Sequence, residues 1–504
     1  MKFNSRYYTL FFTKTQFTIS ITYVLLYIAP LLYKRFSYQA QIDQQEGLFA
    51  YVLLNLMQGK NIYQSPDLNF AGVIYFPTFF WFAKIFASIT KPSIFLLRAI
   101  SWVSLAITCI STHQIVRYFA QFKHRHWAWL WIPVFWIHFP FIAWIDIARL
   151  EAFYLMWLMS GIAFLIHGKN QFKYLFLSGL CFGIAGITKQ SGLLLIGPLF
   201  LLALYQHEYW RVLAVYSIIC GCGLLIFHLK FGGDIWVWAW SVPIHHPINS
   251  MHSIKRHLVT WICTHSSLFL SMIFLLTASI KIKFSSKKDT DNQTIKDNLF
   301  ILTGCIVVML LIHFPAVIKM GGGLIDFPII NAFLALAFPV LFVQYLQFKE
   351  RSFFKDLQLS ILSFLCVFTL IGFEYKQCRE RVTPKKQYEL SYQKLIDYAS
   401  HRPGKTWFFS APWISILANK PAFAPIQQAL GEWILAKKPI HPSFLKAIED
   451  QTFDTIIAGK DLNYSPEFVE LLVKKYNFEP LPKEMVFHHV ENDSVNILYV
   501  LHRK

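Results

Sequence analysis

Two carboxylate side chains, Asp43 and Glu46, lie between an apolar run that ends near Tyr33 and a short amphipathic segment that Gly59 closes. Carboxylates at the end of a membrane-spanning segment can accept a proton or bind a cation. Ordinary solvated charges at a helix start explain this stretch equally well, because acids favour a helix N-terminus. The other loops of the chain must distinguish a catalytic site from a helix start.

A second charged group, Asp146, Arg149 and Glu151, comes directly before an apolar segment that begins near Ala152. Glu151 heads the helix predicted for that segment, where a carboxylate can face a polar cavity. The alternative is that both acids only complement a helix N-terminus, while Arg149 anchors the segment at the lipid head groups.

Lys189 and Gln190 stand at a turn that joins two apolar segments with almost no loop between them. Gly179, Gly183 and Gly186 precede them at helical spacing, which allows a neighbouring helix to pack closely. A phosphate group would suit Lys189 as a partner for its point charge. A lysine that only extends to the membrane surface is the competing interpretation.

Two further segments hold polar residues that could contact a substrate. Residues 234–257 contain tryptophans, which favour membrane anchoring over sugar stacking, and histidines whose spacing matches no familiar zinc site. Three consecutive glycines follow Lys319, where backbone could line a cavity or form a plain flexible loop.

The composition identifies an integral membrane protein. Of 504 residues, 55% are hydrophobic and only 15% are charged, too few charges to cover a soluble surface of this size. Eight cysteines include no CxxC pair, which argues against a disulfide framework and a zinc site. The net charge of +19 comes from basic residues spread over many loops, so it indicates topology and argues against nucleic acid as a partner.

Apolar runs of membrane-spanning length recur up to about residue 374. We predict about eleven spans, at residues 17–33, 96–116, 127–145, 152–167, 174–188, 191–205, 212–229, 258–280, 299–318, 328–348 and 356–374. Residues 72–89 are hydrophobic but contain Pro77 and Lys84, and we interpret them as an interfacial or re-entrant helix.

With residues 72–89 not crossing, the basic residues of all short loops fall on the side of the N-terminal Lys2, Arg6 and Lys14, as the positive-inside rule requires. The opposite, outer face then carries Asp43, Glu46, Asp146, Arg149, Glu151, Lys189 and Gln190. Because charged groups at membrane depth are costly, their gathering on one face predicts a polar cavity there.

The composition changes near residue 375 and divides the chain into a membrane domain, residues 1–375, and a soluble tail, residues 376–504, on the outer face. The tail predicts a small α/β domain. Strand-like runs occur at residues 406–411, 453–459 and 495–502, and amphipathic helices at residues 392–399 and 468–476.

Four stretches, taken in order, resemble the GT-C superfamily of membrane glycosyltransferases, which use polyprenyl-phosphate sugars and include protein O-mannosyltransferases and the aminoarabinose transferase of lipid A. They are QQEGLFAYVLLNLMQGKNIY, VIYFPTFFWFAKIF, ARLEAFYLMWL and GITKQSGLLL. The resemblance extends to about residue 200, and the later spans match in architecture only. It implies a mainly α, GT-C-like membrane protein with interfacial helices in its first outer loop.

The chain departs from the family pattern at both acidic sites. Many members have an adjacent Asp-Glu pair in the first loop, where this chain has Gln45 and Glu46, with Asp43 slightly earlier. At the second site the family commonly has aspartate, where this chain has Glu151. Either Asp43 or Glu46 can therefore take the place of the usual aspartate.

The resemblance implies an inverting transfer of a hexosyl or pentosyl group from a polyprenyl phosphate to a lipid, glycan or protein. A carboxylate would remove the acceptor proton, a role we assign to Glu46 first and Asp43 second. Glu151 would orient the acceptor or hold a divalent cation with the first-loop acid, and Lys189 would bind phosphate. Further candidates for substrate or phosphate contacts are Gln190, Arg149, Asp146, Lys319, Lys255 and Arg256.

Two other classes of protein stay open: a lipid-sugar flippase, although we find no inverted repeat, and a noncatalytic glycolipid-binding scaffold, which the departures would suit. The favoured interpretation is an enzyme of a bacterial inner membrane whose site faces outward. It requires the carboxyl of Asp43 or Glu46 to lie within roughly 12 Å of that of Glu151.

Overall fold

The structure is a computed structural model. It describes residues 15, 18–19, 21–70, 72–120, 122–136, 144–168, 171–246, 248, 250–251, 254–255, 258–259, 262, 265–283, 293–317, 323–347, 383–409, 411–425, 433, 438–459, 466–488, 495–497 and 499–504. The predicted span 356–374, the predicted domain boundary at residues 375 and 376, and the candidates Arg256 and Lys319 lie outside these residues.

The acidic first loop leads from helix α2, Ala29–Phe36, into helix α3, Gln44–Met57. Helix α3 begins there because Asp43 is its N-cap, with an extended backbone and a carboxylate that accepts a hydrogen bond from the N–H of Gln45 at 3.2 Å. Gly59 follows the helix with a φ of 77°, a left-handed conformation that favours glycine. The predicted short helix is confirmed, but it begins earlier than predicted, so Glu46 lies in its first turn and only Asp43 precedes it.

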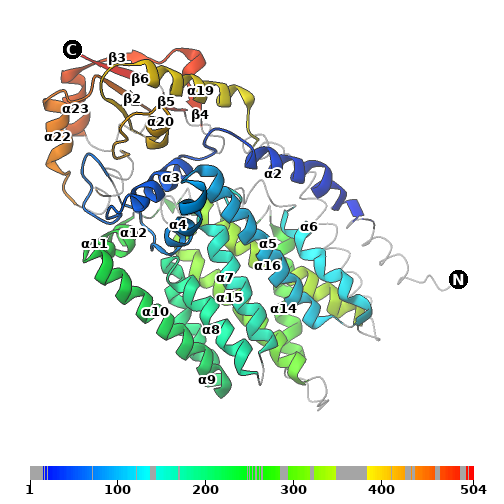
Figure 1. Cartoon of the computed structure of the whole chain (residues 1–504). Coiled ribbons are helices and arrows are strands. Elements are labelled where there is room, and N and C mark those ends of the chain that lie inside the picture. Colours follow the sequence, from blue (N-terminus) through cyan, green and yellow to red (C-terminus); the bar gives the residue numbers. More distant parts are fainter. Residues whose placement is uncertain are drawn as a thin grey trace.

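The membrane domain is a bundle of helices (Figure 1). Its main members are α5 (Ile94–Phe119), α7 (Glu151–His167), α8 (Phe172–Gly186), α9 (Ile196–Tyr205), α10 (Trp210–Phe231), α14 (Ser266–Lys283), α15 (Gln293–Val317) and α16 (Gly323–Gln347). Within the described residues, the segments long and apolar enough to cross a membrane are Ile94–Phe119, His207–Phe231 and Ile295–Pro315. The other apolar segments of the described helices have 10–17 residues, so the number of about eleven spans stays a prediction.

Two segments differ in kind from a simple span. The described part of the predicted span 127–145 continues a 3-10 helix, Phe122–Leu130, and then forms helix α6, Trp131–Trp136. Pro133 accounts for the break, because proline is tolerated in the first turn of an α-helix but clashes with a preceding turn. Helix α4, Thr78–Thr90, has 13 residues against the roughly 20 that a crossing needs, in agreement with an interfacial segment.

Glycines let α8 and α10 pack closely, as their spacing predicted. A Cβ atom added at Gly179 would lie 2.7 Å from the carbonyl oxygen of Val212, and one at Gly183 would lie 2.6 Å from Ile219. Side chains cannot occupy such positions unless a backbone or a β-branched neighbour moves. The close contact of these helices fixes the turn after Gly186, which carries Lys189.

The C-terminal domain is built on a four-stranded sheet in the order β1-β2-β6-β3. Its strands are β1 (Thr406–Phe408), β2 (Thr455–Ala458), β3 (Tyr476–Pro480) and β6 (Tyr499–Arg503), with β1 and β2 parallel and the other pairs antiparallel. Helices α19 (Lys386–His401), α20 (Pro412–Leu417), α22 (Pro442–Glu449) and α23 (Pro466–Lys475) surround it. The predicted α/β character is confirmed, and β3 was missed because its residues continue the pattern of α23.

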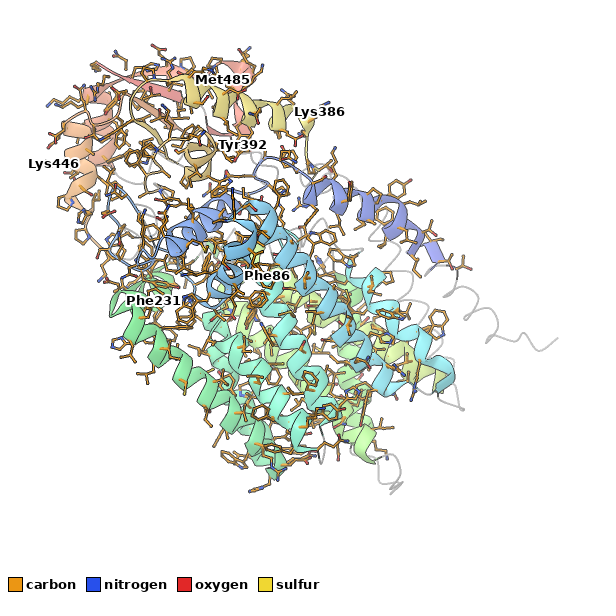
Figure 2. The ribbon with its side chains drawn as sticks, in the orientation of Figure 1. Phe86, Phe231, Lys386, Tyr392, Lys446 and Met485 are labelled. Atoms are coloured by element: carbon orange, nitrogen blue, oxygen red, sulfur yellow. The ribbon has the colours of Figure 1, made fainter. Side chains whose placement is uncertain are left out.

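The C-terminal domain covers the end of the bundle where α3 and α4 lie (Figure 1). Tyr38 and Ile42 of the first loop share a core with Tyr392 of α19. Figure 2 shows Tyr392 on the side of the domain toward the bundle, and Lys446 at its outer edge. Gly47 of α3 leaves room for the side chain of Gln41, since a Cβ there would lie 1.5 Å from Nε2 of Gln41, and Trp413 of α20 packs on the same side, with its Cβ 3.1 Å away. The acidic loop is therefore enclosed between the two domains.

Candidate active site

Four carboxylates and three arginines are buried where the first loop, the loop before α7, and helices α2 and α5 meet. They are Asp43, Glu46, Asp146, Glu151, Arg35, Arg98 and Arg149, and none exposes more than 3% of its surface. Every one of these acids is paired with an arginine. The two acidic loops come together as predicted, with the predicted Arg149 and two further arginines, Arg35 and Arg98, between them. The polar cavity predicted at this place stays a prediction.

Glu46 is saturated with hydrogen bonds. Its Oε1 accepts from Nε of Arg98 at 2.7 Å and from the N–H of Ala148 at 2.9 Å. Its Oε2 accepts from the terminal nitrogen of Arg98 at 2.6 Å and from the N–H of Ile42 at 2.7 Å. The carboxylate thus ties three separate segments of chain together, and its lone pairs are engaged.

Asp43 and Glu151 share the guanidinium of Arg149. The Nη1 of Arg149 lies 3.2 Å from Oδ2 of Asp43, while its Nε lies 3.2 Å from Oε2 of Glu151. Two carboxylates on one guanidinium are well within the roughly 12 Å expected of a shared site. Within the described chain, no donor is recorded on Oδ1 of Asp43, whereas both oxygens of Glu151 accept from Arg149.

Asp146 forms a third pair, with Arg35 at the end of α2. The Nε of Arg35 donates to Oδ2 at 2.8 Å and its Nη2 donates to Oδ1 at 3.1 Å, so that the contact is bidentate. Both side chains are fully buried. This pair attaches helix α2 to the loop before α7 and engages both oxygens of Asp146, whose predicted contact with substrate stays a prediction.

Arg98 was not singled out in the sequence, yet it organises the first loop. Besides Glu46, its guanidinium donates to the carbonyl of Tyr38 and, at 3.0 Å, to the carbonyl of Ala40. Ser101, one turn further along α5, donates to the carbonyl of Ile147 at 2.7 Å. The available signal was an arginine inside a predicted span, since such a charge is costly unless it is paired.

The pKa values of the acids move in different directions. Burial has the larger influence on Asp43 and raises its pKa to about 6, although Arg149 opposes the change. Burial likewise raises the pKa of Asp146 in spite of Arg35. For Glu46, burial acts upward, but Arg98 and two backbone N–H groups outweigh it and hold the pKa below its ordinary value. Asp43 therefore binds a proton at a higher pH than Glu46 does.

The turn with Lys189 and Gln190 is attached to the segment between α3 and α4. The amide of Gln190 donates to the carbonyls of Ile74 and, at 2.6 Å, Ala239, and Thr78 donates to the carbonyl of Ile187. Gln190 thus holds the turn in place, and Lys189 is buried with 6% of its surface exposed.

A divalent cation between Asp43 and Glu151 was one expectation. Arg149 stands between these acids and already supplies the positive charge that an ion would bring. In the described chain no group of three or more His, Cys, Asp or Glu side chains has the arrangement of a metal site. As arranged, these residues do not fit an ion shared by the two acids. Lys255, which the sequence analysis named as a further candidate for a phosphate contact, is exposed.

No family model matches the chain, and no curated protein matches its sequence. Solved structures do match. The oligosaccharyltransferase of Archaeoglobus fulgidus without ligand aligns with a TM-score of 0.53 at 10% identity, over 95% of this chain and 74% of that one. ArnT from Cupriavidus metallidurans bound to undecaprenyl phosphate aligns with a TM-score of 0.51 at 10% identity, over 95% of this chain and 98% of that one.

A further match is the archaeal enzyme AglB from A. fulgidus in complex with an inhibitory peptide and a dolichol phosphate, with a TM-score of 0.51 and 10% identity. These proteins are GT-C membrane glycosyltransferases. At such low identity the likeness concerns the fold. The GT-C fold predicted from the four sequence stretches is confirmed.

Proposed function

We propose that this chain, which has the GT-C fold, is a membrane glycosyltransferase that moves a hexosyl or pentosyl group from a polyprenyl phosphate to a lipid, glycan or protein acceptor. The observation that carries the proposal is the buried pair of carboxylates, Asp43 and Glu151, on the single guanidinium of Arg149. Acids held in this way, at the N-terminal ends of two helices in this fold, suit acid–base chemistry beside a phosphate.

Asp43 is the base in this proposal, in preference to Glu46. Its Oδ1 is the oxygen on which no donor is recorded within the described chain, and its pKa of about 6 leaves it ionised yet basic at neutral pH. Oδ1 takes the proton from the acceptor hydroxyl or amine as the acceptor atom bonds to the sugar C1. The bond from C1 to the phosphate oxygen breaks, and the polyprenyl phosphate leaves with its electron pair. An in-line attack inverts C1.

Glu46 is a positioning residue. Its carboxylate accepts hydrogen bonds from Arg98 and from the N–H groups of Ile42 and Ala148. These bonds hold the loop that ends at Asp43 against the loop that carries Arg149. Because its pKa is lowered, Glu46 is a poor proton acceptor. Its role is to maintain the geometry between Asp43 and Arg149.

Cations serve the leaving phosphate. Arg149 has its guanidinium within 3.2 Å of the base, and this positive charge would stabilise the leaving phosphate. Lys189, in the turn that Gln190 and Thr78 attach to the segment between α3 and α4, would bind the phosphate of the donor as a point charge. Glu151 keeps Arg149 oriented through the contacts of both its carboxylate oxygens.

The positive-inside pattern supports an outward-facing site in a bacterial inner membrane, together with an extracytoplasmic C-terminal domain. An alkaline phosphatase reporter fused after Lys504 should then be active, because that enzyme matures only outside the cytoplasm. If that fusion were inactive and a cytoplasmic reporter at the same position were active, the C-terminal domain would lie in the cytoplasm and the proposed orientation would be wrong.

The experiment that tests the function compares cell-envelope glycans and lipids by mass spectrometry with and without the gene. A glycan or lipid decoration should disappear in the deletion, return with the parent gene, and stay absent with Asp43→Asn at equal protein level. Restoration by Asp43→Asn would exclude Asp43 as the base and leave Glu46 as the candidate, and restoration by Glu46→Gln as well would favour a noncatalytic scaffold. The mass lost would identify the sugar and the acceptor together.

A further inference from the structure

Trp144 lies in the loop before α7, at the edge of the acid cluster. Its ring stands over the guanidinium of Arg149, with 5.0 Å between the Cζ of Arg149 and the centroid of the ring. A cation within about 6 Å of the centroid of an aromatic ring is attracted by the ring face, and tryptophan attracts it most strongly. Arg149 therefore has a third partner besides Asp43 and Glu151.

The carboxylates hold Arg149 less closely than they hold the other two arginines of the cluster. The shortest distance from Arg149 to a carboxylate oxygen is 3.2 Å, whereas it is 2.6 Å for Arg98 and 2.8 Å for Arg35. Hydrogen bonds between a guanidinium and a carboxylate are ordinarily about 2.7–2.9 Å long. A ring over the guanidinium therefore has more influence on the position of Arg149 than it would have at a tightly paired arginine.

The junction between the two domains limits the movement of Trp144 itself. The tryptophan is partly buried against a core that includes Ile42 of the first loop, Ile147 of the loop before α7 and Tyr392 of the C-terminal domain. Packing on this side restricts the orientations of the ring. Trp144 thus connects the core of the junction with the guanidinium of Arg149.

Membrane anchoring is the ordinary role of a tryptophan near the end of an apolar segment, and Trp144 lies near the end of the predicted span 127–145. An anchoring ring lies among lipid head groups. The ring of Trp144 instead contacts a buried guanidinium and the core of the junction. Anchoring alone predicts no influence of Trp144 on the protonation of Asp43, and this difference can be measured.

We propose that Trp144 is a positioning residue whose ring face holds the guanidinium of Arg149 against Asp43. Burial and Glu46 raise the pKa of Asp43, and Arg149 opposes the rise. Without the ring, the guanidinium would move away from Oδ2 of Asp43, and the pKa of Asp43 would rise above about 6. Less of this carboxyl would then be ionised at neutral pH. The consequence for transfer rests on the proposed function, whereas the contact itself does not.

An NMR titration of the Asp43 carboxyl tests the proposal, on the full-length protein labelled at aspartate in lipid nanodiscs, with Asp43→Asn to assign the signal. Trp144→Leu should raise the midpoint by roughly one pH unit, a tenfold change in proton affinity, because the paired cation has moved away. Trp144→Phe keeps an aromatic face and should stay closer to the parent value.

Trp210→Leu is the matched control and should titrate as the parent protein does. Trp210 begins α10 next to α9, at the end of the bundle away from the C-terminal domain (Figure 1). Thermal unfolding of each variant shows that a shifted midpoint does not come from a loss of folding. If Trp144→Leu does not fold, Trp144→Met replaces it, since methionine also removes the ring.

An unchanged midpoint in the variant without the ring would overturn the proposal, and so would an equal shift in Trp144→Phe. In transfer assays the inflection of kcat/KM should move to higher pH with the midpoint. If the midpoint shifts as expected and deletion of the gene changes no envelope glycan or lipid, only the proposed function is contradicted. If a decoration depends on the gene and the midpoint is unchanged, only the role of Trp144 is contradicted.

Discussion

Glu46 with Arg98 and Asp43 with Arg149 are two ion pairs on the same short stretch of chain, yet they differ in how completely their oxygens are engaged. Glu46 accepts four hydrogen bonds at 2.6 to 2.9 Å. Asp43 accepts two, both at 3.2 Å and both on Oδ2. A saturated carboxylate holds structure together, while a carboxylate with an oxygen to spare can take a proton.

The two acids also differ in the direction in which their pKa values are shifted. Strong pairing outweighs burial at Glu46 and lowers its pKa, whereas the weaker pairing at Asp43 leaves burial as the larger influence and raises its pKa to about 6. Two acids separated only by Gln44 and Gln45 therefore have opposite properties. Substitutions that keep the shape of each side chain should separate them.

The largest effect should follow from Asp43→Asn. Losing a general base lowers kcat by roughly 100-fold to 10,000-fold, and binding of the donor should stay near the parent value. Stability should change little, because asparagine caps a helix as well as aspartate and Arg149 keeps Glu151 as a partner. The measurement is radiolabelled sugar transfer beside a thermal unfolding curve. Full activity in Asp43→Asn would remove Asp43 from the chemistry.

Glu46→Gln should instead act mainly on stability. Neutralising one partner of a buried pair leaves the guanidinium of Arg98 uncompensated and costs about 3–5 kcal/mol in the free energy of unfolding. Denaturant unfolding of the detergent-solubilised protein measures this loss. In a double-mutant cycle, Glu46→Gln with Arg98→Met should cost less than the sum of the single changes. If the losses in unfolding free energy were additive, and Glu46→Gln were stable but inactive, Glu46 would be the general base.

The pH profile separates the two acids without mutation. Asp43 must be ionised to accept a proton, so kcat/KM should fall as the pH drops through about 6, by roughly tenfold for each further unit. Glu46, whose pKa is lowered, remains ionised over that range and adds no inflection. Transfer assays in liposomes across this range provide the profile. An inflection below the ordinary range of a glutamate would point to Glu46.

Lys189→Ala should have the smallest effect and a different character. Removing a phosphate contact should raise the KM for the lipid-linked donor about tenfold and lower kcat less. Lys230→Ala, an exposed lysine near the end of α10, is the control and should match the parent. If Lys189→Ala changed kcat but not the KM for the donor, Lys189 would not contact the donor in the enzyme–donor complex before reaction.

Composition and periodicity were enough for the class of protein and for much of its local structure. The apolar runs predicted membrane helices, and short strand-like runs predicted β1, β2 and β6. The division into two domains near residue 375 stays a prediction, because that boundary lies outside the described residues. The four ordered stretches predicted the GT-C fold. These features depend on residues close together in the chain, which is the information that a pattern contains.

The choice between Asp43 and Glu46 belongs to the tertiary structure. Arg98 lies 52 residues from Glu46, and Arg149 lies 106 residues from Asp43. The family resemblance ranked Glu46 before Asp43, while the local pattern places both acids at the start of the same helix. Proton affinity depends on which donors lie within hydrogen-bonding distance and how much water is excluded, and both are set only when α5 and the loop before α7 fold against the first loop.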